Sequence, residues 1–287
     1  MGLLSSPSAG LALACALSSN RGANAAPRPS GRASQDENRV SQFTFVGIDD
    51  ATMQTIALRY SIEARRGDTF TVYVPAVEAA AFLTLAPQAR LVTADVDAES
   101  YPRGPNDRAG YPSYDEIRAT FADYQIENPD LALVPDLPWM VSQDGLPIVV
   151  LKLSGDVAED NFAKPAIVIT ASTHGDEWIT TPVVMGLIER LVMGYGSEAR
   201  ITKMLDWSSV YFVPAVSPDS FQSSRNVHGV DPNRVYPYPG NDAEPSIASA
   251  RNMIRFYDML KPAGSLDYHA NIGMVLYPWG WSCNPLD

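Results

Sequence analysis

Short apolar strands alternate with helices through the second part of the chain, and this alternation constrains the fold more than any other feature. Residues 166–170 (AIVIT) form a continuous apolar run, which is typical of a strand covered on both faces. Interleaved strands and helices indicate an α/β domain with a mixed β-sheet flanked by helices. The other strands are predicted over 146–153, 210–216, 265–268 and 275–277, and the helices over 114–127, 181–193 and 246–260.

A smaller α/β domain is expected to precede this one, over residues 41–103. Residues 42–48, 69–74 and 89–96 predict strands, and residues 77–85 predict a short helix. A segment rich in Pro and Gly, residues 102–112, then marks a linker before the main domain, which we expect over residues 111–287.

The first 40 residues have a different character. Residues 10–17 form an apolar stretch that is too short to span a bilayer, and Ala23-Asn24-Ala25 fits a signal-peptidase site. We therefore expect a signal peptide over residues 1–25, a linker over residues 26–40, and a secreted, periplasmic or extracellular protein. The alternative is a disordered tail rich in Ala, Ser and Pro. No later segment is long and apolar enough to predict a transmembrane helix.

The charge of the chain argues against one class of partner. The net charge is −12, from 33 acidic and 21 basic residues. Nucleic-acid binding relies on clustered Lys and Arg, so we expect no nucleic-acid partner.

The chain has only three histidines, and two of them stand where predicted strands end. His174 follows the apolar strand and precedes a helix, with Glu177 three residues later, and His269 ends another predicted strand. Ligands bind at the carboxyl ends of strands in open α/β sheets. Imidazole and carboxylate groups are good zinc ligands, and a catalytic zinc site uses three protein ligands. Taken alone, the His-x-x-Glu pair is more typical of an exposed histidine near a helix N-terminus than of a metal site.

Further motifs give this pair a specific context. Gly229-Val230-Asp231-Pro232-Asn233-Arg234 lies between Glu177 and the Asp-x-His sequence that ends at His269. In this order, the motifs resemble those of the M14 zinc carboxypeptidase family, over roughly residues 111–281. The match extends to Tyr114-Asp115-Glu116-Ile117, Asn128-Pro129, Pro218-Asp219 and Leu276-Tyr277-Pro278.

The resemblance implies a role for each matching residue. His174, Glu177 and His269 match the family's ligands of one Zn²⁺ ion, and Asp231 matches the carboxylate that orients a zinc-bound imidazole. Three more residues match groups of the family that contact substrate. Asn233 and Arg234 match the pair that binds the C-terminal carboxylate, and Arg225 matches the arginine that polarises the scissile carbonyl. The implied activity is zinc-dependent hydrolysis of the C-terminal bond of a peptide or protein. For the two arginines, the alternative is a surface salt bridge; His228 matches no ligand.

The sequence departs from the family after the third ligand. Only 18 residues follow His269 in the chain of 287, and the sole acidic one is Asp287. The family's general-base glutamate would stand further along, so we expect an incomplete catalytic domain that binds zinc but hydrolyses peptides poorly. Residues 41–103 resemble, more weakly, the small activation segment of secreted family members.

Two other functions remain open. One is a non-catalytic zinc protein that recognises peptide C-termini, which the absent glutamate favours. The other is a zinc-dependent deacylase of N-acyl amino acids, because such enzymes also use His-x-x-Glu and a distant histidine.

Overall fold

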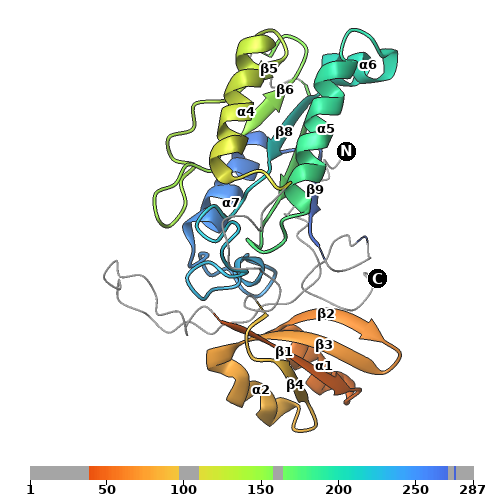
Figure 1. Cartoon of the computed structure of the whole chain (residues 1–287), viewed down its shortest axis with the longest axis vertical. Helices are drawn as coiled ribbons and strands as arrows, with labels where there is room; N and C mark the ends of the chain where they lie inside the picture. Colours follow the sequence, from red (N-terminus) through yellow and green to blue (C-terminus); the bar gives the residue numbers. More distant parts are fainter. Residues whose placement is uncertain (1–38, 97–109, 158–163, 271–274, 276–287) are drawn as a thin grey trace, which may run out of the picture.

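The computed structural model of the protein describes residues 39–96, 110–157 and 164–270, together with residue 275. These residues form two units, each with its own β-sheet (Figure 1). The expected signal peptide, nearly all of the two expected linkers, and the end of the strand expected over 275–277 lie outside the described residues.

The small unit, residues 39–96, is an antiparallel sheet in the order β2-β3-β1-β4. Its core is mainly aromatic: Phe82 contacts Phe43, Phe45 and Tyr60 with ring centroids 5.0 to 6.1 Å apart. The small unit therefore buries a hydrophobic cluster of its own. Its strands are β1 (Val40–Val46), β2 (Ser61–Arg66), β3 (Thr69–Pro75) and β4 (Arg90–Thr93), and its helices α1 (Asp50–Ala57), η1 (Ala76–Glu78) and α2 (Ala79–Leu85).

The main unit begins at residue 110 and contains a mixed sheet in the order β5-β6-β8-β7-β9. The central strand β7 pairs in parallel with β8 and β9, whereas β6 pairs antiparallel with both β5 and β8. The mixed α/β class expected from the sequence is confirmed. The strands are β5 (Ala132–Leu133), β6 (Leu151–Leu153), β7 (Ala166–Ala171), β8 (Ser209–Val213) and β9 (Gly264–Tyr268).

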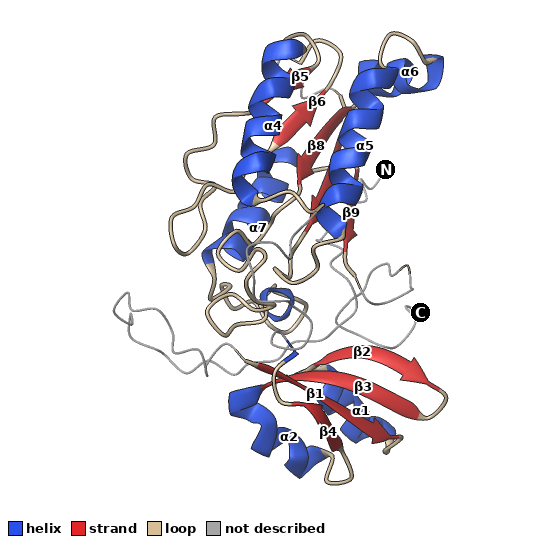
Figure 2. Ribbon diagram, in the orientation of Figure 1, coloured by secondary structure: helices blue, strands red, loops and turns tan. Residues whose placement is uncertain are grey.

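Helices cover both faces of this sheet (Figure 2). Ile169 of β7 packs in a cluster with residues of α4 and α5, and the neighbouring Val168 packs in a second cluster with residues of α7. Successive side chains of a strand point to opposite faces, which explains the continuous apolar run of β7. The helices are α4 (Tyr114–Glu127), α5 (Thr180–Gly194), α6 (Ala199–Trp207), η2 (Pro232–Arg234) and α7 (Ala248–Leu260).

Most of the predicted elements of the main unit are present, with one clear difference. The strand predicted over 146–153 is confined to β6, Leu151–Leu153, because Pro147 has no N–H to donate to a ladder and makes only an isolated bridge with Val141. Sequence reasoning missed α1, β2, β5 and α6. Strand β2 (SIEARR) is largely polar and gave no apolar signal.

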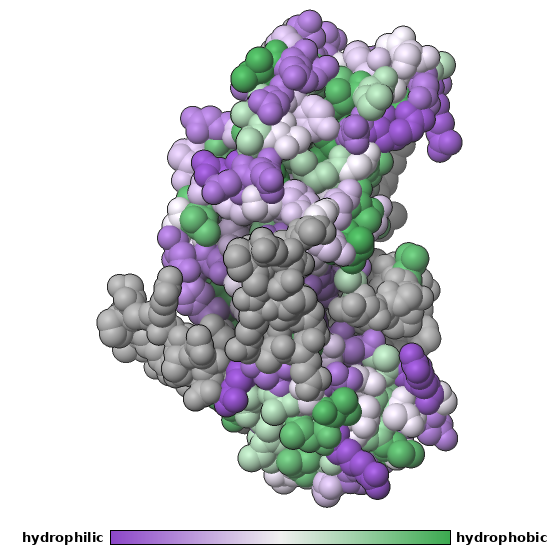
Figure 3. All heavy atoms as spheres, in the orientation of Figure 1, coloured by the Kyte–Doolittle hydropathy of each residue, from purple (hydrophilic) through white to green (hydrophobic). Residues whose placement is uncertain are grey.

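The surface of the small unit carries several exposed apolar side chains. Val46, Leu91 and Val92 on its β-strands and Val77 on η1 are each more than half exposed. Figure 3 shows apolar residues on this unit and hydrophilic residues gathered near α6 at the far end of the main unit.

The parallel pairing of β7 with β9 brings together the two loops that follow these strands. In the pairing of β7 with β9, Ala171 lies opposite Tyr268, so the two strands end at the same edge of the sheet. His174 follows the first strand and His269 follows the second. Residues that are 95 positions apart (174 to 269) are therefore neighbours in space.

A capping box starts α4, and we predict that it contributes measurably to stability. Ser113 Oγ accepts a hydrogen bond from the Glu116 N–H (3.2 Å), and the Glu116 carboxylate accepts one from the Ser113 N–H (2.7 Å). Ser113→Ala should lower the free energy of unfolding by about 1 kcal/mol in urea titrations followed by circular dichroism. Asp123→Ala, at an exposed position of the same helix, is the control and should change it by less than about 0.5 kcal/mol. Equal effects of the two substitutions would contradict the prediction.

Candidate metal centre

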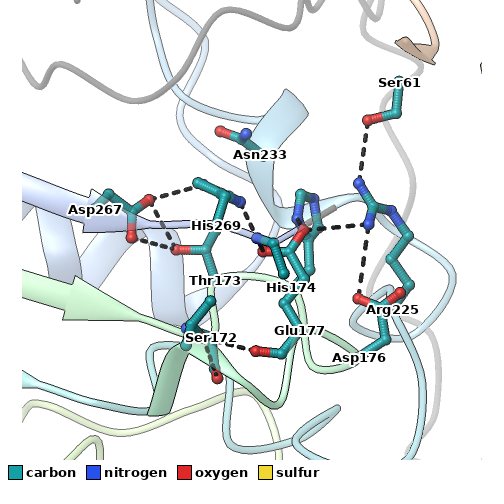
Figure 4. A network of polar contacts seen from close by, with 12 residues as sticks. Ser61, Ser172, Thr173, His174, Asp176, Glu177, Arg225, Asn233, Asp267 and His269 are labelled. Atoms are coloured by element: carbon teal, nitrogen blue, oxygen red, sulfur yellow. Dashed lines mark hydrogen bonds and ion pairs between the residues drawn. The ribbon is translucent and has the colours of Figure 1, made fainter. Parts of the chain in front are cut away.

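Three side chains expected to bind metal converge at the edge of the sheet where β7 and β9 end (Figure 4). His174 Nδ1 lies 3.0 Å from Glu177 Oε1, and His269 Nδ1 lies 2.9 Å from Glu177 Oε2. All three ligand atoms lie within 4.8 Å of one another, and His174 and Glu177 are buried. The three residues that the sequence motifs singled out therefore lie close together in space.

The loop that carries His174 and Glu177 is held close to the loop that carries Arg225. The Gly175 N–H donates to the Arg225 carbonyl (3.3 Å), and the Gly175 carbonyl accepts from the Gln222 N–H (2.9 Å). A Cβ atom at Gly175 would lie only 2.1 Å from the Ser220 carbonyl oxygen. Glycine is required here by close backbone approach, and the contact brings the metal-binding loop and the arginine loop together.

Each imidazole also contacts a second carboxylate through its other ring nitrogen. His174 Nε2 lies 2.9 Å from Asp231 Oδ1, and His269 Nε2 lies 2.9 Å from Asp267 Oδ2. Both histidines thus present Nδ1 to Glu177 while Nε2 faces an aspartate. The Asp231 contact agrees with the role implied by the family motif; the Asp267 contact was not foreseen, although the Asp-x-His spacing places both residues on one side of a strand.

The two arginines singled out in the sequence are buried beside this group, contrary to the surface alternative. Arg225 is 2% exposed and Arg234 is 9% exposed. Arg225 Nη1 lies 3.4 Å from Glu177 Oε1 and 3.6 Å from Asp176 Oδ1. Arg234 follows Asn233, whose N–H donates to Asp231 Oδ1 (2.8 Å). The substrate-gripping residues expected from the family motif therefore adjoin the metal ligands.

The small unit supplies partners to both arginines, which sequence reasoning did not foresee. Glu63 Oε1 lies 2.9 Å from Arg225 Nη2, and the Ser61 hydroxyl lies 3.2 Å from Arg225 Nη2 and 2.9 Å from Arg234 Nη2. The Tyr60 carbonyl accepts a longer bond from Arg234 (3.4 Å). Glu63 itself is 6% exposed, so β2 meets the arginines away from bulk water.

Electrostatics lowers the pKa of two carboxylates of the site, Glu177 and Asp231. Burial alone would raise the pKa of Glu177, but the charge of His174 and hydrogen bonds from His174 and His269 lower it far below its usual range. Burial would also raise the pKa of Asp231. The charges of His174 and Arg234 outweigh this effect and lower the pKa strongly. Zinc ligation requires a deprotonated carboxylate, and the lowered pKa of Glu177 meets that requirement.

Carboxylates outnumber guanidinium groups around the trio. Five buried or largely buried carboxylates meet two guanidinium groups and two imidazoles here: Glu63, Asp176, Glu177, Asp231 and Asp267 against Arg225, Arg234, His174 and His269. Two imidazole nitrogens and one carboxylate form a donor set typical of zinc, and the carboxylates behind the imidazoles are typical of zinc sites. The residues present therefore fit the ion.

A second group of acidic and imidazole side chains lies elsewhere, formed by Asp144, Asp219 and His228. His228 is more than a third exposed and lies 3.1 Å from Asp144 Oδ1. Asp219 accepts hydrogen bonds from the Gln143 N–H (2.8 Å), the Asp144 N–H and the Ser142 hydroxyl. This group braces a loop, and His228 takes no part in the main site.

Fold and site together place a His-Glu-His trio at the edge of a mixed sheet, close to two buried arginines. The family model described as zinc carboxypeptidase matches residues 119–287. The chain belongs to this M14 zinc carboxypeptidase family.

Relatives of known name agree with this assignment. The chain is 26% identical to carboxypeptidase A2 of Mus musculus over 218 residues, which cover 63% of this chain and 50% of the relative. It is 25% identical over 176 residues to the inactive metallocarboxypeptidase ECM14 of Saccharomyces cerevisiae, covering 50% of this chain and 41% of that one. The chain thus spans about half the length of these curated relatives. The fold is similar to the crystal structure of carboxypeptidase A from Helicoverpa armigera, with a TM-score of 0.54 and 16% identity over 82% of this chain and 70% of that one.

We predict that zinc binding depends on two of the three histidines. The purified chain should retain about one equivalent of zinc after dialysis, because one trio fits the ion, and His174→Ala or His269→Ala should each retain almost none. Atomic absorption measures the metal, and His228→Ala serves as the control that keeps it. Zinc loss in the His228→Ala chain equal to that in the other two would contradict the assignment.

Proposed function

We propose that the protein is a zinc-dependent metallocarboxypeptidase that holds one Zn²⁺ ion with His174, Glu177 and His269 and removes the C-terminal residue of peptides or proteins. The observation that carries the proposal is the convergence of this trio with two buried arginines. A metal trio alone would fit many hydrolases. A carboxylate-binding arginine beside it is what a carboxypeptidase requires.

Each residue then has a task toward the substrate. Arg234 and Asn233 would bind the free C-terminal carboxylate, since the planar guanidinium of arginine matches a carboxylate with two parallel hydrogen bonds. Arg225, which adjoins Glu177, would donate to the oxygen of the scissile carbonyl as negative charge develops there. Bound zinc would supply Lewis acidity that polarises this carbonyl and activates water.

The small unit would restrain this activity as an inhibitory pro-segment. Glu63 and Ser61 accept hydrogen bonds from Arg225 and Arg234, and a substrate would need the same N–H groups. A peptide carboxylate and the Glu63 carboxylate therefore compete for buried positive charge. The small unit has its own core, so it can separate from the main unit without unfolding it.

Export from the cell is also part of the proposal, on the signal-like pattern of residues 1–25. Within the described part of the chain, no helix is long and apolar enough to cross a membrane.

A non-catalytic role in binding peptide C-termini is the second candidate. It would use the same arginines and the same metal site without turnover. One relative is named as an inactive metallocarboxypeptidase, so membership of the family does not by itself establish hydrolysis. A deacylase of N-acyl amino acids is the third candidate, and no observation favours it over the other two.

A pair of matched peptides separates these functions. We predict that the zinc-loaded chain shortens a peptide with a free C-terminus only slowly, by one residue, and leaves its C-terminally amidated twin intact, because Arg234 needs a carboxylate to bind and the small unit competes for the arginines. Mass spectrometry follows the products, and a chelator should stop the reaction. Binding of the free-acid peptide without shortening would overturn the catalytic proposal in favour of the binder. Hydrolysis of an N-acyl amino acid alone would favour the deacylase.

The proposed inhibition makes its own prediction at Glu63. Glu63→Lys places a cation against Arg225, so it should displace the small unit and tighten binding of the free-acid peptide at least tenfold, or about 1.4 kcal/mol. Isothermal titration calorimetry on the full chain measures this affinity. Asp68→Lys makes the same charge change in the exposed turn after β2 and should leave the affinity unchanged. Unchanged affinity in the Glu63→Lys chain would contradict the pro-segment role.

A further inference from the structure

Asp267 is a carboxylate at the candidate metal centre to which neither the family motif nor the proposed mechanism gives a task. It lies on β9 two residues before His269, and its side chain is 5% exposed. Figure 4 shows it beside His269 and Thr173, on the side of the site away from Arg225.

The surroundings of Asp267 hold its carboxylate in one orientation. Oδ1 accepts a hydrogen bond from the Thr170 hydroxyl (2.7 Å), and both oxygens lie near the Thr173 hydroxyl (3.3 and 3.2 Å). Oδ2 also lies 2.9 Å from His269 Nε2. A carboxylate has about four lone-pair positions, and three donor groups face them here, two hydroxyls and one imidazole nitrogen. Asp267 thus acts as an acceptor, and it lies outside the trio whose ligand atoms converge.

The contacts of Asp267 join the two separate segments that carry the metal-binding imidazoles. Thr170 lies on β7, opposite Asp267 in the register of the sheet, and Thr173 immediately precedes His174 in the chain. His269 lies on the other segment, after β9. One carboxylate thus fixes the ring of the second histidine and the loop that carries the first.

We propose that Asp267 is a positioning residue that holds His269 with its Nε2–H toward the sheet and its Nδ1 lone pair toward the metal site. The inference rests on the proposed zinc site. An imidazole hydrogen-bonded at Nε2 keeps its proton there, which leaves Nδ1 as the nitrogen that ligates. Without the aspartate, the ring is free to rotate about its Cβ–Cγ bond and to take the other tautomer. Partners of this kind typically change metal affinity 10- to 100-fold when removed.

A purely structural role is the competing explanation, because Asp267 also links β9 to β7 through Thr170. Thr170→Val removes that link and keeps the shape of the side chain, but leaves the contact with His269 in place. Asp267→Asn keeps an oxygen that accepts from Nε2–H, whereas Asp267→Ala removes it. The three variants therefore separate the strand link from the imidazole contact.

The experiment measures zinc affinity, cobalt spectra and thermal stability of the full chain for the wild type and these three variants. Zinc Kd comes from competition with a chromophoric chelator, and the visible absorption of bound Co²⁺ reports the ligand geometry. We expect Asp267→Ala to weaken zinc binding 10- to 100-fold and to change the cobalt spectrum, with a smaller loss for Asp267→Asn. Thr170→Val should lower the melting temperature but keep the wild-type Kd and cobalt spectrum.

Two results would overturn the inference while the proposed function stands. One is a Kd for Asp267→Ala within twofold of the wild type in a chain that binds zinc. The other is an equal loss of affinity in Thr170→Val and Asp267→Ala, which would make the role structural. A folded wild-type chain that binds no zinc would overturn the proposed function, and this inference with it.

Discussion

The whole site depends on one buried carboxylate, that of Glu177. A carboxylate removed from water costs several kcal/mol unless charged or hydrogen-bonding partners replace the solvent. Glu177 meets the imidazoles of His174 and His269 and lies 3.4 Å from Arg225, so its partners come from three separate segments of the chain. The parallel pairing of β7 with β9 brings two of them together, and the close approach at Gly175 brings the third. The pairing of the strands and the geometry of the site are therefore linked, because both bring partners to the Glu177 carboxylate.

The same need for charge partners links the main unit to the small one. Arg225 is buried, and its charge is offset by Glu177 and Asp176 on one side and by Glu63 of the small unit on the other. The aromatic ring of Tyr73, also in the small unit, lies 5.2 Å from the guanidinium carbon. An arginine that needs such partners when buried is equally suited to bind an anionic ligand once the small unit has moved away. In the proposed function, the Arg225 guanidinium therefore pairs with Glu63 while the small unit is in place and binds the substrate once the small unit has moved away.

Local sequence patterns were enough to predict much of this arrangement. The apolar run at β7, the amphipathic helix α4 and the ligand trio each depend on residues within a few positions, or on ordered motifs at the ends of strands. What the sequence did not reveal depends on contacts between distant segments. Glu63 lies 162 positions from Arg225 in the chain, and nothing near it in the polar strand β2 marks it as a partner of a buried arginine. Asp267 carried a usable signal in its spacing from His269, but its contacts with Thr170 and Thr173 appear only when β7 and β9 are paired.

The imidazoles of His174 and His269 are held by different parts of the structure. His269 is fixed through Asp267 to paired strands of the sheet. His174 is fixed through Asp231, which also accepts the Asn233 N–H at the start of η2, the short helix that ends with Arg234. Any group that binds Arg234, whether Ser61 of the small unit or a carboxylate, acts on the segment that orients His174. The imidazole of His269 is therefore anchored to the sheet, while that of His174 is coupled to Arg234, which the small unit contacts.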